Sequence, residues 1–114
     1  MIETETLYAI DEHPDYFVSS QGNVYSFKWG QWKILQKEIS TNGYARVTLD
    51  GKHKHVSKLV LSALYPQPGE EYIAYHLDGD KLNDSLSNLV WATKSDAQIV
   101  RDYTLEAKKR YFNL

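Results

Sequence analysis

The sequence predicts one mixed α+β unit, in which a small N-terminal antiparallel sheet is followed by a helix, a β-β-α motif and a C-terminal helix. Three observations support this fold class. Residues 15–56 contain short apolar segments between glycine turns, residues 57–64 change to helical spacing, and residues 72–110 follow a strand, loop, strand, helix pattern. The 114-residue length suits one compact unit, with residues 1–56 expected as a β module and residues 57–114 as the ββα region.

Tight turns define the strands of the first half. Gly22 and Asn23 tolerate positive φ, and Asp50-Gly51 is a strong signal for a two-residue hairpin. A further turn is expected over residues 29–32. The expected strands are residues 15–19, 24–27, 33–35, 44–49 and 52–56.

Two helices are expected in the second half, around a pair of strands at residues 72–76 and 89–92. The Ser57 hydroxyl can cap a helix that Pro66 stops. Thr93 and Asp96 have the spacing of a capping box, which predicts one last helix reaching about residue 110. The inner face of this last helix is expected to carry Ile99, Val100 and Tyr103, and its solvated end to carry Lys108, Lys109 and Arg110.

Composition and charge exclude several classes of protein. The chain has no cysteine, so disulfides and cysteine-ligated zinc are excluded. No apolar run is long enough to span a bilayer, and no signal peptide is expected at the acidic start. A net charge of −2 weighs against a protein that functions only by binding duplex DNA, because phosphate neutralisation supplies most of the affinity for a duplex.

The residues with most chemical content run from His76 through Asp78 and Gly79 to Asn83, and then from Asn88 through Trp91 to Thr93. This pattern resembles the His-Asn-His (HNH) homing endonucleases of phages. Their motif is His-x-Asp-Gly-x-x-x-Asn, then Asn-Leu-x-Trp-x-Thr, then a helix. Residues 16–26 and 43–44 resemble the small module that often precedes this domain. The resemblance covers about residues 7–98 and implies a ββα, or His-Me finger, fold.

The resemblance implies a role for each residue of the motif. In the family the first histidine is a general base that activates water, and a divalent ion stabilises the phosphodiester and its leaving oxygen. These roles place the base at His76 and a loop-bracing amide at Asn88. The family's ion ligands are the residue just before the histidine and a residue on the following helix. These two positions correspond to Tyr75 and Ala97 in this sequence. A phenol with a pKa of about 10 is a poor ligand for a hard cation, and alanine is none. The protein is therefore predicted to have lost metal-dependent cleavage, and no cofactor is expected.

Two alternatives stay open at this site. Asp78, Asp80 or Asp96 could supply oxygen ligands, which would give an active enzyme that uses Mg²⁺. Acids in such loops more often fix turns, and Asp96 lies roughly 100° around the helix from Ala97. His76 could also persist with Asn88 only as a hydrogen-bonding brace. Ser57 stands where the family usually has histidine, which is a further departure from the family's pattern.

Basic and aromatic side chains are the candidates for holding a phosphate ligand. Alternation along residues 52–55 puts two lysines on one face and two histidines on the other. This segment is either a solvated edge hairpin or a phosphate-contacting rib. Trp29 and Trp32 either stack on a base or cover the core. The expected ligand-binding residues are Lys52, Lys54, His55, Lys58, Tyr75, His76, Lys81, Trp29 and Trp32.

The favoured function is a non-catalytic phage protein that binds nucleic acid or a nucleotide-type phosphate ligand. Such binding includes the sequestration of a signalling nucleotide in counter-defence. The alternatives are an active magnesium-dependent nicking endonuclease and an inhibitor that binds a host defence protein. The expected location is the cytoplasm of an infected bacterium, without a membrane partner. A homo-oligomer formed through the last helix stays open.

Overall fold

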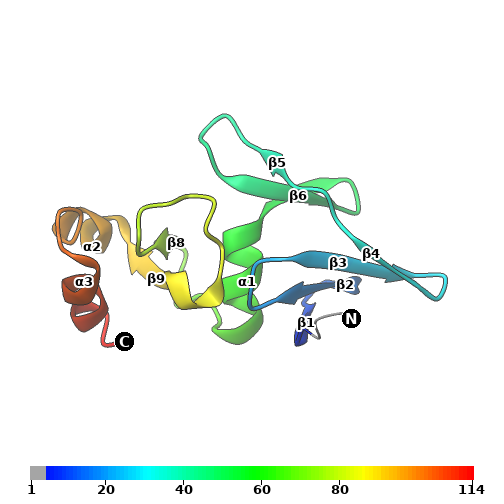
Figure 1. Ribbon diagram of the computed structural model, residues 1–114, viewed down its shortest axis with the longest axis horizontal. Coiled ribbons are helices and arrows are strands. Elements are labelled where there is room, and N and C mark those ends of the chain that lie inside the picture. Colours follow the sequence, from blue (N-terminus) through cyan, green and yellow to red (C-terminus); the bar gives the residue numbers. More distant parts are fainter. Residues whose placement is uncertain (1–4) are drawn as a thin grey trace.

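The computed structural model describes residues 5–114, which form three small antiparallel sheets and three α-helices (Figure 1). The mixed α+β class is confirmed. The sheets have the strand orders β1-β2-β3-β4, β5-β6-β7 and β8-β9. Within the described part, no helix is long and apolar enough to cross a membrane. The strands are β1 (Leu7–Ile10), β2 (His13–Ser19), β3 (Val24–Lys28), β4 (Gln31–Ile34), β5 (Glu38–Ile39), β6 (Ala45–Leu49), β7 (Lys52–His55), β8 (Tyr72–His76) and β9 (Leu89–Thr93), and the helices are α1 (Val56–Leu64), the 3₁₀ turn η1 (Leu86–Asn88), α2 (Lys94–Ile99) and α3 (Leu105–Tyr111).

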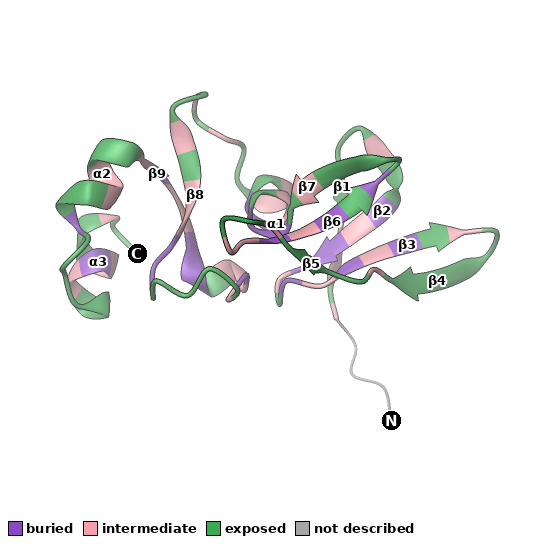
Figure 2. Cartoon of the chain, turned by 90° about the horizontal axis from the view of Figure 1, so that it is seen from above, coloured by how far each residue is buried: buried purple, intermediate pink, exposed green. Residues whose placement is uncertain are grey.

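The core gathers around α1, which lies between the sheets (Figures 1 and 2). Burial of apolar surface against this helix is the main stabilising contribution. By contrast, β4 is exposed along its whole length. The buried apolar residues of α1 are Val56, Val60 and Leu61, and they cluster with Val18 and Val24 of the first sheet, Val47 and Leu49 of the second, and Leu89 of the third.

The turn between β2 and β3 packs against the loop between β8 and β9. The amide of Leu86 donates to the Ser20 carbonyl at 2.8 Å. Gly22 is buried with φ of 90°, and a Cβ there would lie 3.0 Å from the carbonyl oxygen of Asp84. Glycine is therefore required at this turn both for its backbone conformation and for the close approach of the loop.

Several expectations about the first helix and the strands are wrong in detail. Helix α1 begins at Val56, its N-cap is His55, and Ser57 is a buried residue inside the helix rather than its cap. The turn before β4 contains only Trp29 and Gly30, both with positive φ, so the strand starts at Gln31. Strands β1 and β5 are not among those expected from the sequence. The Asp50-Gly51 hairpin and the Thr93–Asp96 capping box are confirmed.

The prediction of a single last helix is also wrong, because the chain forms two helices with a break at residues 100–104. The Thr104 hydroxyl accepts a hydrogen bond from the amide of Ala107 at 3.2 Å, which starts α3 as a separate element. Val100 is fully buried at the break, but Ile99 and Tyr103 are exposed by 51% and 43%. The helical stripe expected from the sequence therefore does not face the core.

Candidate functional site

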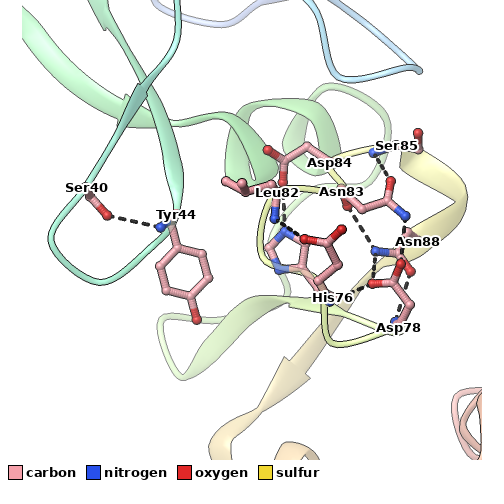
Figure 3. Close-up of polar contacts among 10 residues, drawn as sticks. Ser40, Tyr44, His76, Asp78, Leu82, Asn83, Asp84, Ser85 and Asn88 are labelled. Carbon is pink, nitrogen blue, oxygen red and sulfur yellow. Dashed lines mark hydrogen bonds and ion pairs between the residues drawn. The ribbon is translucent and has the colours of Figure 1, made fainter.

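A polar network organises the loop between β8 and β9, with Asn88 at its centre (Figure 3). The Asn88 Oδ1 accepts a hydrogen bond from the amide of Asp78 at 3.0 Å. Its Nδ2 donates to Asp78 Oδ1 at 2.8 Å and to the carbonyl of Asn83 at 3.0 Å. One buried amide, on the residue just before β9, therefore ties the start of the loop at Asp78 to its middle at Asn83 and fixes the loop's shape.

His76, the last residue of β8, forms a buried pair with Asp84. Its Nε2 lies 2.7 Å from Asp84 Oδ1, and the two side chains are only 5% and 2% exposed. The other carboxylate oxygen, Asp84 Oδ2, is buried without a hydrogen-bond partner among the described residues. A carboxylate behind a histidine favours the proton on the facing nitrogen. The pair therefore leaves Nδ1 of His76 as the nitrogen for another partner.

Tyr44 connects this histidine to basic residues of the second sheet. The Tyr44 ring centre lies 5.9 Å from that of His76 and 5.5 Å from that of His55. The Lys81 ammonium lies 4.9 Å from the same ring and donates to the Asn42 carbonyl at 3.0 Å. A cavity of about 340 Å³ opens beside this stack, with Tyr44, His55 and Lys58 in its lining. The fold thus brings together His55, Lys58, His76 and Lys81 of the predicted ligand-binding set.

The three acidic residues considered as replacement metal ligands are engaged in turns and a helix cap. Burial alone would raise the pKa of Asp78, but hydrogen bonds from Asn83, the Asp80 amide and Asn88 lower it below its ordinary value. Asp80 accepts from the amide of Leu82. The phenol of Tyr111, 2.7 Å from Asp96 Oδ1, together with the cap at Thr93 lowers the pKa of Asp96.

The two residues expected from the sequence at the ion positions have side chains that do not suit a divalent ion. Tyr75 packs beside Phe112 of the C-terminal segment, with the ring centres 6.0 Å apart, and Ala97 offers no ligand atom. Within residues 5–114, no group of three His, Asp or Glu side chains is placed to hold a metal. The Lys108 ammonium lies over the Tyr75 ring, with Nζ 5.2 Å from the ring centre.

The other predicted ligand-binding residues lie away from His76. Trp29 is 95% exposed at the tip of the β3–β4 hairpin, which lies at the opposite end of the molecule from α3 (Figure 1). Trp32 is 54% exposed and packs against Phe17 and Phe27 on the outer face of the first sheet. The interpretation of both tryptophans as core residues is therefore wrong. Lys52 is exposed beside the β6–β7 turn, and Lys54 lines a second groove with His13, to which His55 and Lys58 also contribute.

Sequence reasoning missed three residues of the site. Asp84 is indistinguishable in the sequence from the turn-forming acids of the same loop, although it alone among them is buried. Tyr44 lies 32 positions before His76 and is brought beside it by the fold. Lys108, expected at a solvated helix end, is only 7% exposed.

Comparisons with known proteins agree with this fold. Residues 8–50 match the NUMOD4 motif. The H-N-H endonuclease F-TflII of Escherichia phage T5 is 37% identical over 105 residues, which cover 86% of this chain and 53% of the relative. The DNA endonuclease I-HmuI of Bacillus phage SP01 is 37% identical over 83 residues, covering 69% of this chain and 47% of the relative. The chain therefore spans about half the length of these curated relatives.

A solved structure extends the match to three dimensions. The structure described as DNA binding and cleavage by the HNH homing endonuclease I-HmuI superposes with a TM-score of 0.71 and 31% identity. The match covers 92% of this chain and 65% of that one. The NUMOD4 motif, the two phage relatives and the fold together support an HNH homing endonuclease family for this chain.

Proposed function

We propose that this chain binds DNA through its HNH site without a divalent ion and without cleaving the strand. The observation that carries the proposal is the side-chain chemistry at the two ion positions. Tyr75 and Ala97 occupy them, and the nearby acids already hold turns or a helix cap. Phosphodiester cleavage in this family depends on the ion, whereas phosphate binding needs only donors and positive charge.

The retained part of the site supports a binding role. The Asn88 network keeps the loop in one shape, and the His76–Asp84 pair keeps the imidazole in one orientation. Lys58 and Lys81 supply positive charge on the side of Tyr44. Because the net charge is −2, the interaction is expected to be local and to weaken steeply with salt. The I-HmuI structure is described as one of DNA binding and cleavage, which supports DNA as the ligand.

A nucleotide-type ligand is the second candidate, and the cavity beside Tyr44 favours it. About 340 Å³ is at the small end of the range for small-molecule pockets. Tyr44, Tyr72 and Trp91 offer ring faces in its lining, and His55 and Lys58 offer polar and charged groups. A phosphate ester held there would be sequestered rather than cleaved, as a counter-defence protein requires.

One set of assays tests the proposal. Purified protein and a His76→Ala variant are incubated with supercoiled plasmid in EDTA, Mg²⁺ or Mn²⁺, and DNA retention is measured at low salt. We expect retention in EDTA and no nicking in any condition. Nicking that needs the metal and is lost in His76→Ala would overturn the proposal in favour of an active nicking enzyme. Nucleotide released from denatured protein would favour the second candidate.

The proposed setting follows from the relatives. F-TflII and I-HmuI belong to phages of Escherichia and Bacillus, so we place this protein in the cytoplasm of an infected bacterium. If neither DNA nor nucleotide is retained at low salt, binding to a host defence protein becomes the better account. Sedimentation velocity of the same preparation measures whether copies associate through the C-terminal helices.

A further inference from the structure

Lys108 is a buried lysine on the inner side of α3. It is 7% exposed, although Lys109 and Arg110 beside it are more accessible. Its Nζ donates to the carbonyl of Leu77 at 3.0 Å and lies 5.2 Å from the centre of the Tyr75 ring. The ammonium is therefore held against the two residues that flank His76 in the sequence.

The surroundings of this ammonium are unusual for a structural lysine. Among residues 5–114, no carboxylate pairs with Lys108, since every ion pair of the described part involves other residues. An ammonium is seldom buried without a countercharge, because desolvation is costly and one carbonyl satisfies only one of its three donors. A residue that costs stability in this way is best explained by a ligand that supplies the missing negative charge.

We infer that the Lys108 ammonium takes the place of the divalent ion in this HNH site and serves as its fixed cation for a DNA phosphate. The inference rests on the proposed function and explains how binding proceeds without metal. Tyr75, at the first ion position, faces the ammonium, and α2, which carries Ala97 at the second, packs against β8 and β9. The hydrogen bond to the Leu77 carbonyl fixes the position of the ammonium beside the C-terminal end of β8.

An ammonium performs only part of an ion's task. It attracts a phosphate, and its effect is strong because the site is shielded from water. It is not a Lewis acid, so its remaining N–H groups can hydrogen-bond a phosphate but cannot polarise the phosphodiester and its leaving oxygen as a bound divalent ion does. A site with Lys108 in this position is therefore expected to bind a phosphodiester and to leave it intact.

The first test compares Lys108→Met with Lys109→Met, which removes the same charge one residue further along α3. DNA affinity is measured in EDTA by fluorescence anisotropy, and stability by urea unfolding. We expect Lys108→Met to weaken binding about tenfold, and Lys109→Met by less than about threefold. Lys108→Met is also expected to be at least as stable as the wild type, because it removes an unpaired buried charge. Unchanged affinity, or a clear loss of stability, would assign Lys108 a merely structural role.

The second test asks whether the lysine and a metal exclude each other. Ligands are introduced with Tyr75→Asp and Ala97→Asn, with and without Lys108→Met, and Mn²⁺ binding is followed by isothermal titration calorimetry. We expect Mn²⁺ to bind the triple variant at least about tenfold more tightly than the double variant, which keeps the ammonium. Equal binding by the two, or no binding by a folded triple variant, contradicts the placement of Lys108. This comparison needs no DNA, so it still decides the inference if the wild type fails to bind DNA.

Discussion

At the scale of single residues, the orientation of the site histidine depends on the buried pair of His76 and Asp84. The pair fixes one imidazole nitrogen against a carboxylate and leaves the other for a ligand. The second oxygen of Asp84 has no partner in the described part of the chain, so the carboxylate is held by one strong hydrogen bond. Charge-assisted hydrogen bonds of this length are about twice as strong as neutral ones.

Replacing Asp84 measures the strength of this pair. Asp84→Ala leaves a buried N–H of His76 without an acceptor and is expected to lower the free energy of unfolding by about 2 kcal/mol. Asp84→Asn keeps an acceptor oxygen and is expected to lose less. Urea unfolding gives the stabilities, and ¹⁵N shifts of His76 give its tautomer. If Asn costs as much as Ala, the negative charge rather than the hydrogen bond is what matters.

At the scale of elements, the β8–β9 loop is held by side chains rather than by regular structure. Asn88→Ala removes three hydrogen bonds and is expected to cost about 2–3 kcal/mol. Amide exchange of residues 78–86 should accelerate while α1 stays protected. Ser87→Ala, at the exposed neighbour, is the control and should change neither quantity. Equal exchange in both variants would argue against Asn88 as the organiser of the loop.

The same loop predicts a dependence on pH. The pKa of Asp78 is lower in the folded protein than its ordinary value of about 3.9, because of its hydrogen bonds to Asn83, Asp80 and Asn88. Its contribution is therefore fully present above about pH 5 and is lost as the pH falls through the folded pKa. Unfolding of wild type and Asp78→Asn between pH 2.5 and 6 should converge at the acid end. A stability difference that stays constant with pH contradicts this assignment.

Helix α3 depends on its own cap, since the break at residues 100–104 separates it from α2. Thr104→Ala removes the hydrogen bond to the Ala107 amide and is expected to cost about 1 kcal/mol. Exposed Ser95→Ala in α2 is the matched control, expected within about 0.5 kcal/mol of wild type. Hydrogen exchange should show α3 opening before α1. Loss of α2 and α3 protection together would mean that the two helices behave as one.

At the scale of the whole molecule, the sequence predicts the fold class and most of the strands better than it predicts which side chains are buried against one another. The glycine turns, the switch to helical spacing and the motif around His76 and Asn88 suffice for the fold class and for the strand pair of the site. The burial of Lys108 depends on the break after Val100, and that of Asp84 on the approach of Gly22, so neither follows from local pattern. The short edge strands β1 and β5 are set by pairing with their neighbours rather than by their own propensity.

DNA binding by this chain is proposed to need no divalent ion. The most direct measurement is the affinity for a fluorescent DNA duplex in EDTA, compared with equal concentrations of Mg²⁺ and of putrescine. Putrescine carries the same charge, so it competes for DNA phosphates in the same way, but it cannot fill a metal site. We expect measurable binding in EDTA, with the affinities in Mg²⁺ and in putrescine agreeing within about twofold. Binding that appears only with Mg²⁺ would contradict this proposal.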